Sequence, residues 1–143
     1  MGVSVNRHSR GNALTLVIVN TYIVYPKDNK TPDKVIILLT DIFGIYTNTQ
    51  LLADDFANKG YLIVMPDLFQ GGQLSATSMH SSNIDLSSWL PKHQVAQIDP
   101  IMEKTIKYVR ETLDMKRVGA VGYCIGAKVG LPPSFMTKLY RSL

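Results

Sequence analysis

The sequence has very little cysteine and no long hydrophobic run. Of its 143 residues only Cys124 is a cysteine, so an internal disulfide and a CxxC metal or redox pair are both excluded. Apolar runs such as residues 35–39 are only five residues long, whereas a helix that crosses a membrane needs roughly 18. No membrane-spanning segment is therefore expected.

Charged residues of either sign are also scarce. Lys and Arg number 15 and Asp and Glu 11, which gives a net charge of +4 with only 18% charged residues. The basic residues are scattered along the chain, so a nucleic-acid partner is not indicated. Apolar residues make up 45% of the sequence, which is too many for a disordered chain and predicts one domain over residues 1–143.

The first 27 residues contain no acidic side chain, which is a weak feature of organellar presequences. No clear amphipathic helix accompanies this feature. We therefore expect a soluble cytoplasmic protein, with a mitochondrial location as the less favoured alternative.

Short hydrophobic runs alternate with helical patterns along the chain. The runs are rich in β-branched residues and Leu, which predicts strands. They cover residues 15–25, 35–40, 61–65 and 117–121. A helix is predicted from about 47 to 59 with Gly60 ending it, and another from Asp99 with Pro100 in its first position. Residues 68–97 show no clear period and predict a long excursion. This order is typical of an α/β fold with a mostly parallel sheet and flanking helices.

The stretch from Gly122 to Gly126 reads Gly-Tyr-Cys-Ile-Gly and follows a predicted strand. It fits the pattern of a nucleophile between two glycines, which are needed because side chains there would collide with the neighbouring strand and helix. The turn would lift the Cys124 sulfur above the sheet, where a helix start favours the thiolate. The backbone N–H of Ile125 would then be an oxyanion donor. A small buried hydrophobe is the alternative interpretation of this cysteine.

The loop after the predicted strand 35–40 is a second candidate. It contains Asp41, Ile42 and Gly44, and it begins where doubly wound sheets place their ligands. In hydrolases of this architecture such a loop supplies the second oxyanion N–H, here that of Ile42. Asp41 either contacts the thiol or stabilises the loop itself.

Together these stretches resemble the dienelactone hydrolase family. The resemblance rests on residues 35–44, 60–67 and 118–128, and residues 89–93 have a counterpart in the eukaryotic branch of the family. It covers about residues 20–128 and implies an α/β-hydrolase fold. The type reaction of the family opens a lactone or enol ester through an acyl-thiol intermediate, and no cofactor or metal is implied.

The resemblance also assigns roles to individual residues. Cys124 matches the nucleophile, and Ile125 and Ile42 match the oxyanion donors. Asp41 replaces an acidic residue that is Glu in well-known members and contacts the thiol there.

The sequence departs from the family after the nucleophile. A family triad continues with Asp and then His, but the residues after Cys124 include no Asp, Glu or His. We therefore expect a partial domain that lacks the C-terminal strands and ends in a divergent tail, 131–143. His93 is a candidate for a recruited base, with Trp89 beside it lining a substrate pocket. The alternative for His93 is a solvated or packing histidine.

The sequence thus predicts a thiol-dependent hydrolase of small esters or lactones. The alternative is a catalytically inactive half-domain that acts by binding or has become vestigial. A nucleotide-binding module is disfavoured because residues 119–126 lack the G-x-G-x-x-G spacing. If the strand at 117–121 lies at the sheet edge, it would also allow self-association.

Overall fold

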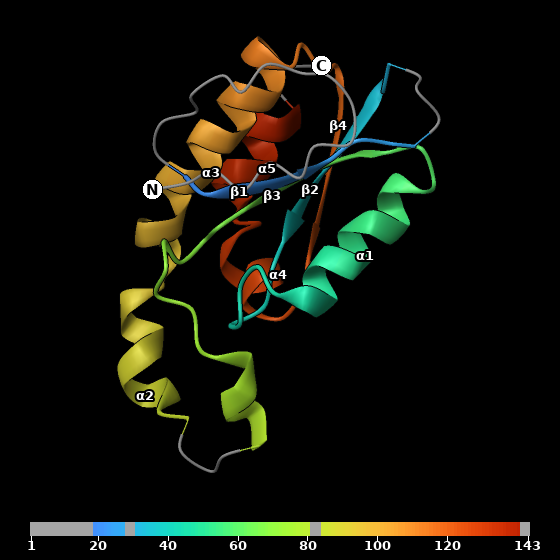
Figure 1. Cartoon of the computed structure of the whole chain (residues 1–143). Helices are drawn as coiled ribbons and strands as arrows, with labels where there is room; N and C mark the ends of the chain where they lie inside the picture. The colour runs from blue at the N-terminus through green and yellow to red at the C-terminus, as the bar shows by residue number, and fades with distance from the viewer. Residues whose placement is uncertain (1–18, 28–30, 81–83, 141–143) are drawn as a thin grey trace.

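A mixed four-stranded sheet forms the centre of the computed structural model, which describes residues 19–27, 31–80 and 84–140 (Figure 1). The strand order is β1-β3-β2-β4. The strands are β1 (Thr21–Val24), β2 (Lys34–Leu39), β3 (Leu62–Pro66) and β4 (Arg117–Gly122). β1 alone runs antiparallel, beside β3, while β2 pairs parallel with both β3 and β4. The predicted α/β architecture with a mostly parallel sheet is confirmed. Residues 15–18 of the first predicted strand and 141–143 of the tail lie outside the described residues.

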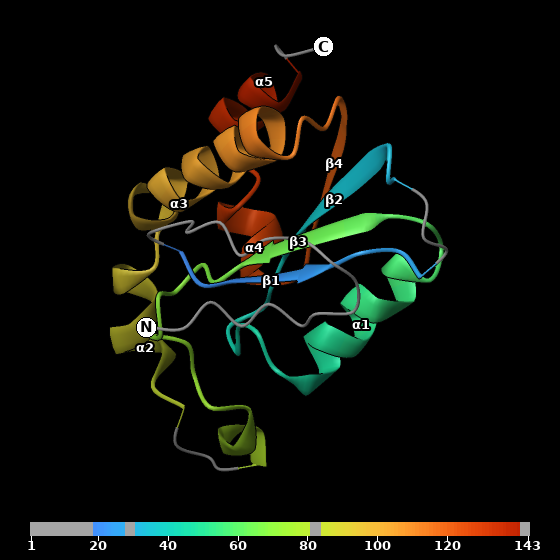
Figure 2. The same cartoon turned by 45° about the horizontal axis from the view of Figure 1, so that its top comes forward.

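Helices cover both faces of this sheet (Figures 1 and 2). One face packs against α1 (Thr47–Ala57). The other packs against α3 (Val95–Lys107), α4 (Ile125–Val129) and α5 (Pro133–Tyr140). The remaining pieces are short: η1 (Ala76–His80), α2 (Leu86–Trp89), η2 (Leu90–Lys92) and a π-helical turn, η3 (Tyr108–Thr112). In the part of the chain described here, no helix is long and apolar enough to cross a membrane.

Alternating side chains of β3 divide the core into two layers. Leu62 and Val64 face α3, whereas Ile63 and Met65 face α1, and all four are fully buried. Because successive side chains of a strand point to opposite faces, a strand covered on both sides has no position for a polar residue. This explains the continuous hydrophobic run that predicted the strand.

The first helix matches its prediction and the second does not. α1 ends at Ala57, and Gly60 follows with φ +91°, a conformation that glycine adopts without strain. The helix predicted from Asp99 instead begins one turn earlier, and Pro100 lies inside it. The side chain of Gln97 accepts a hydrogen bond from the Gln94 backbone N–H (3.0 Å), which caps the earlier start.

The structure also corrects the expectations for the excursion 68–97 and for the tail 131–143. The excursion 68–97 is not irregular throughout, since it contains η1, α2, η2 and the first three residues of α3. Within the tail 131–143, Pro133 starts α5 rather than only ending α4. α5 buries Phe135 and Leu139 against the α3 side of the sheet, so these tail residues belong to the core.

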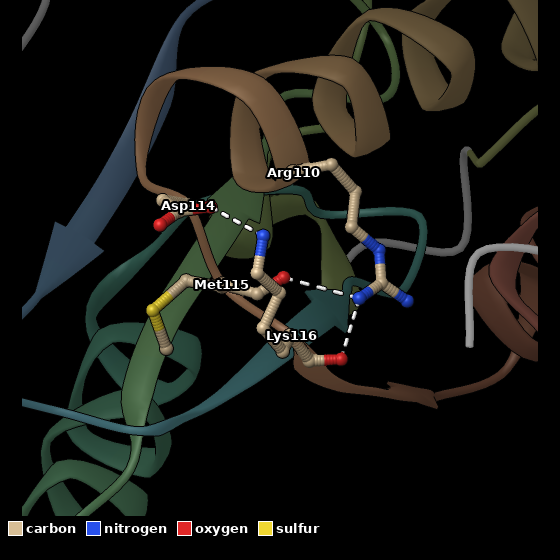
Figure 3. Close-up of polar contacts among 4 residues, drawn as sticks. All are labelled: Arg110, Asp114, Met115 and Lys116. Atoms are coloured by element: carbon tan, nitrogen blue, oxygen red, sulfur yellow. Dashed lines mark hydrogen bonds and ion pairs between the residues drawn. The ribbon is translucent and has the colours of Figure 1, made fainter.

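The Arg110 side chain joins η3 and the turn before β4 to α5, which is distant in sequence. From η3, its Nη1 donates to the carbonyl oxygens of Met115 (3.1 Å) and Lys116 in the turn before β4 (Figure 3). Its Nη2 donates to the carbonyl oxygen of Leu139 in α5 (3.0 Å). Hydrogen bonds from a charged donor are about twice as strong as neutral ones, so Arg110 holds α5 and the start of β4 together.

Replacing this arginine should therefore destabilise the fold. We expect Arg110→Met to lower the free energy of unfolding by about 2–3 kcal/mol, because three carbonyl oxygens lose a charged donor. Urea denaturation followed by circular dichroism measures this. Lys116→Met is the control: it removes only the exposed ion pair with Asp114 and should cost less than about 0.5 kcal/mol. Equal losses in the two variants would contradict the assigned role.

The outer edge of β4 is expected to mediate self-association. Within the described residues β4 pairs only with β2, and between Val118 and Gly122 it carries no charged side chain to block edge pairing. Sedimentation velocity should show a dimer that forms as concentration rises. Gly119→Lys should shift it to monomer, because a lysine on an edge strand opposes pairing with a second strand. The fold should tolerate this change, since a Cβ at residue 119 comes no closer than 4.0 Å to its nearest neighbour, the Val35 oxygen. Leu51→Lys, the same charge change on α1, should not. A concentrated wild-type monomer would refute the expectation.

Candidate active site

Cys124 lies on a strained turn between β4 and α4. Its backbone has φ 52° and ψ −119°, a region that residues with a Cβ rarely adopt, and its side chain is exposed. The turn is held by hydrogen bonds from the Tyr123 N–H to the Leu39 oxygen (3.0 Å) and from the Gly126 N–H to the Tyr123 oxygen (2.9 Å). The predicted strand–turn–helix arrangement around Cys124 is present, and the cysteine is not a buried hydrophobe.

The two glycines around Cys124 are required by close backbone contacts. A Cβ on Gly122 would lie 2.7 Å from the backbone N and Cα of Ala127 in α4. A Cβ on Gly126 would lie 2.7 Å from the carbonyl oxygen of Leu39 and closer still to that of Thr40, at the end of β2. Both distances are shorter than real Cβ atoms tolerate, so only glycine allows the turn to approach the helix and the strand.

Ile42 and Ile125 lie with Cys124 in one cavity wall, and their backbone N–H groups are candidates for oxyanion donors. Because Leu39 pairs with Gly122 in the sheet, the loop after β2 lies beside the turn after β4. Neither N–H has an acceptor among the described residues. The Ile42 carbonyl accepts a hydrogen bond from the Leu74 N–H (2.9 Å), which fixes this loop.

The Asp41 carboxylate makes its hydrogen bonds within its own loop. Oδ1 accepts from the Phe43 N–H (2.9 Å) and Oδ2 accepts from the Tyr46 hydroxyl (3.2 Å). Burial, followed by the charge of Asp41 and this hydrogen bond, raises the pKa of Tyr46 above its usual value. Of the two roles considered for Asp41, the geometry shows the stabilisation of the loop.

Cys124 opens into a cavity of about 460 Å³. Its wall is formed from three parts of the chain and is mostly apolar. The lining residues are Ile42, Leu86, Leu90, Gln94, Cys124, Ile125, Lys128 and Val129. A volume of this size lies within the range of small-molecule sites, about 300–1,000 Å³.

Five of these lining residues were missed by sequence reasoning. Gln94 directly precedes α3, and Lys128 lies on α4. Leu86 and Leu90 are spaced by four, as are Ile125 and Val129, so each pair lies along one helical face. The spacing was readable in the sequence. That the two faces oppose each other across a cavity was not, because it depends on how the excursion folds back.

Trp89 and His93 lie beside this wall and are not part of it. Their rings stack with centroids 4.0 Å apart, and both pack edge-on against Phe69. The Trp89 Nε1–H donates to the Gly72 carbonyl oxygen (2.7 Å), and His93 Nδ1 lies 3.0 Å from the Trp89 oxygen. Neither residue lines the cavity, and the contacts of His93 are those of a packing residue.

The described cavity lining contains no histidine and no carboxylate. His80 lies in η1, but its side chain is outside the described part of the structure, as is all of His8. In the described ranges, no group of three or more His, Cys, Asp and Glu side chains could hold a metal ion. Among the described residues, the site therefore consists of an exposed cysteine, two backbone N–H groups without an acceptor and an apolar cavity.

Comparison with known proteins identifies the family. The model of the dienelactone hydrolase family matches residues 19–135, which is most of the chain. The chain belongs to the dienelactone hydrolase family. This confirms the resemblance noted in the sequence, and it extends the match into the first part of the tail.

Curated relatives of this dienelactone hydrolase family member include fungal and animal proteins. Hydrolase pyvD of Aspergillus violaceofuscus is 44% identical over 111 residues, 77% of this chain and 44% of the relative. Hydrolase tropI of Talaromyces stipitatus is 37% identical over 134 residues, 85% of this chain and 52% of the relative. A carboxymethylenebutenolidase homolog of Xenopus tropicalis is 27% identical over 130 residues, 90% of this chain and 51% of the relative. The chain thus spans about half the length of these relatives.

Solved structures show the same fold. A Klebsiella pneumoniae protein described as a candidate dienelactone hydrolase aligns with a TM-score of 0.58 at 22% identity. The alignment covers 74% of this chain and 44% of that one. The sheet and helices described above are therefore those of an α/β hydrolase.

The strain at Cys124 should be measurable as lost stability. We expect Cys124→Gly to exceed Cys124→Ala in free energy of unfolding by about 1 kcal/mol, because glycine adopts φ 52° without a Cβ clash. This gain outweighs the extra freedom of glycine in the unfolded chain. Urea denaturation of both variants measures the difference. Cys124→Ala is the matched reference, since it removes the sulfur and keeps the Cβ; equal stability would argue against strain.

Proposed function

We propose that Cys124 attacks the carbonyl carbon of small esters or lactones and becomes acylated. The observation that carries this proposal is an exposed cysteine with φ 52° at a cavity whose wall also includes Ile42 and Ile125. Strained backbone is retained where it holds a reactive group in place. Family membership supports a hydrolase of this kind.

The reaction would proceed in two steps. First, the thiolate sulfur forms a bond to the carbonyl carbon, and the carbonyl oxygen becomes an oxyanion that accepts hydrogen bonds from the N–H groups of Ile42 and Ile125. The carbon–oxygen bond of the ester then breaks, and the alcohol leaves with a proton from water. In the second step water attacks the acyl-cysteine and releases the acid.

The second step needs a base that the described cavity lacks. Water is a poor nucleophile, and a base that takes its proton contributes typically 10²- to 10⁴-fold. His93 is committed to packing with Trp89 and Phe69. We therefore expect the chain as given to acylate and then to lose the acyl group slowly.

The missing base also favours a second candidate function. A half-domain that binds small esters at Cys124 without turnover would have this apolar cavity and no histidine in its described lining. For either function the partner is a small molecule and the nucleophile is a reduced thiol. A reducing compartment preserves that thiol, which is consistent with the cytosol expected from the sequence.

Acylation without turnover is directly testable. On mixing with p-nitrophenyl acetate, we expect a burst of about one nitrophenol per chain and an acetyl adduct on Cys124 that persists, because no base activates water. Absorbance follows the burst, and intact-protein and peptide mass spectrometry follow the adduct.

Two variants serve as controls for this experiment. Cys124→Ala should show neither the burst nor the adduct. His93→Phe retains an aromatic ring for stacking and should leave the burst and the lifetime of the adduct unchanged. Sustained turnover by the wild type would overturn the slow-release account, and its loss in His93→Phe would identify that histidine as the base.

A further inference from the structure

The part of the cavity wall contributed by α2 and η2 consists of exposed apolar side chains. Leu86 and Leu90 line the cavity, yet they are 40% and 38% exposed. They are four residues apart, so both side chains lie on the same face of the α2–η2 segment. We call this pair the leucine wall.

The leucine wall is held in place by the residues around it. Trp89 lies between the two leucines in sequence, is buried, and is fixed by its hydrogen bond to Gly72 and its ring contacts. Asp85 caps α2 by accepting a hydrogen bond from the Ser88 N–H (3.1 Å), and its hydrogen bonds with Ser87 and Ser88 lower its pKa to about 2. The wall is therefore an ordered surface and not a collapsed loop.

The opposite side of the cavity is apolar as well. Ile125 and Val129 lie one turn apart on α4, and Ile42 is contributed by the loop after β2. Of the two polar lining residues, Gln94 uses its amide to donate to the Leu90 carbonyl oxygen. Lys128 is the single charged residue of the described lining, and its long aliphatic stem adds further apolar surface.

Building on the proposed acylation of Cys124, we propose that the leucine wall makes the site selective for esters with an apolar acyl chain of about four to eight carbons. The chain would lie between the leucine wall and the Ile125–Val129 face of α4. In the step tested, the thiolate sulfur bonds to the acyl carbon, the carbon–oxygen bond breaks, and the alkoxide or phenolate leaves. Each methylene buried against the wall stabilises the bound ester, so acylation becomes faster as the chain grows.

The test is the acylation rate of Cys124 as a function of acyl chain length. p-Nitrophenyl acetate, butyrate, hexanoate and octanoate are compared below their micellar concentrations, with free glutathione as the reference for intrinsic reactivity. We expect the second-order rate constant, relative to glutathione, to rise at least about tenfold from acetate to hexanoate. A flat or falling series would overturn the proposal.

Variants of the leucine wall link the preference to this surface. In Leu86→Asn and Leu90→Asn, which keep the size of the side chain and remove its apolar character, the hexanoate-to-acetate ratio should fall at least about threefold. Leu51→Asn makes the same change at an exposed leucine of α1 and should leave the ratio unchanged. An equal fall in Leu51→Asn, or none in the wall variants, would refute the assignment.

A charged substrate tests the alternative that Lys128 selects the acyl group. The p-nitrophenyl monoester of adipic acid has a six-carbon acyl chain ending in a carboxylate. Preference for hexanoate over this monoester supports the leucine wall. Preference for the monoester, lost in Lys128→Met, would overturn the proposal in favour of an anionic acyl chain.

A separate readout distinguishes failure of this proposal from failure of the proposed function. If no ester acylates Cys124, the proposed function fails, and the wall is tested by protection of Cys124 from iodoacetamide. Hexanamide, which is neutral and stable, should slow labelling at concentrations where acetamide does not. Protection would support the wall as an apolar binding surface, and its absence would refute it.

Discussion

The contact between Gly126 and the carbonyl oxygens at the end of β2 is the constraint on which the site depends. Because Gly126 has no side chain, the start of α4 approaches the end of the neighbouring strand closely. That approach fixes the turn at Cys124 with φ 52° and places Ile125 beside the loop that contains Ile42. The strained turn is stabilised by the buried sheet around it, a common arrangement at reactive sites.

The loop after β2 lines the cavity with Ile42 and not with the charged side chain of Asp41. Both carboxylate oxygens of Asp41 accept hydrogen bonds inside that loop, so the carboxylate orders the segment that carries the Ile42 N–H. Lys128 is consequently the single charged residue among the described lining residues. An apolar surrounding strengthens any hydrogen bond to a developing oxyanion, because little water competes for the same donors.

The excursion between β3 and α3 combines two functions in one short segment. Trp89 points into the fold and packs with Phe69 and His93, while the neighbouring Leu86 and Leu90 line the cavity. Anchoring by one buried aromatic residue leaves the adjacent helical face free to meet a ligand. His93, the histidine nearest in sequence to the cavity wall, accordingly packs against Trp89 and Phe69.

The sequence by itself determined the mostly parallel sheet and the turn at Cys124. These follow from short-range patterns: continuous apolar runs for strands covered on both faces, and paired glycines around the nucleophile. Only the tertiary structure decided the start of α3 at Val95, the burial of α5, the hydrogen bonds of Asp41 and the residues of the cavity wall. Each of these depends on which distant segment a side chain meets, and that partner is fixed by packing of the whole chain and not by the local pattern.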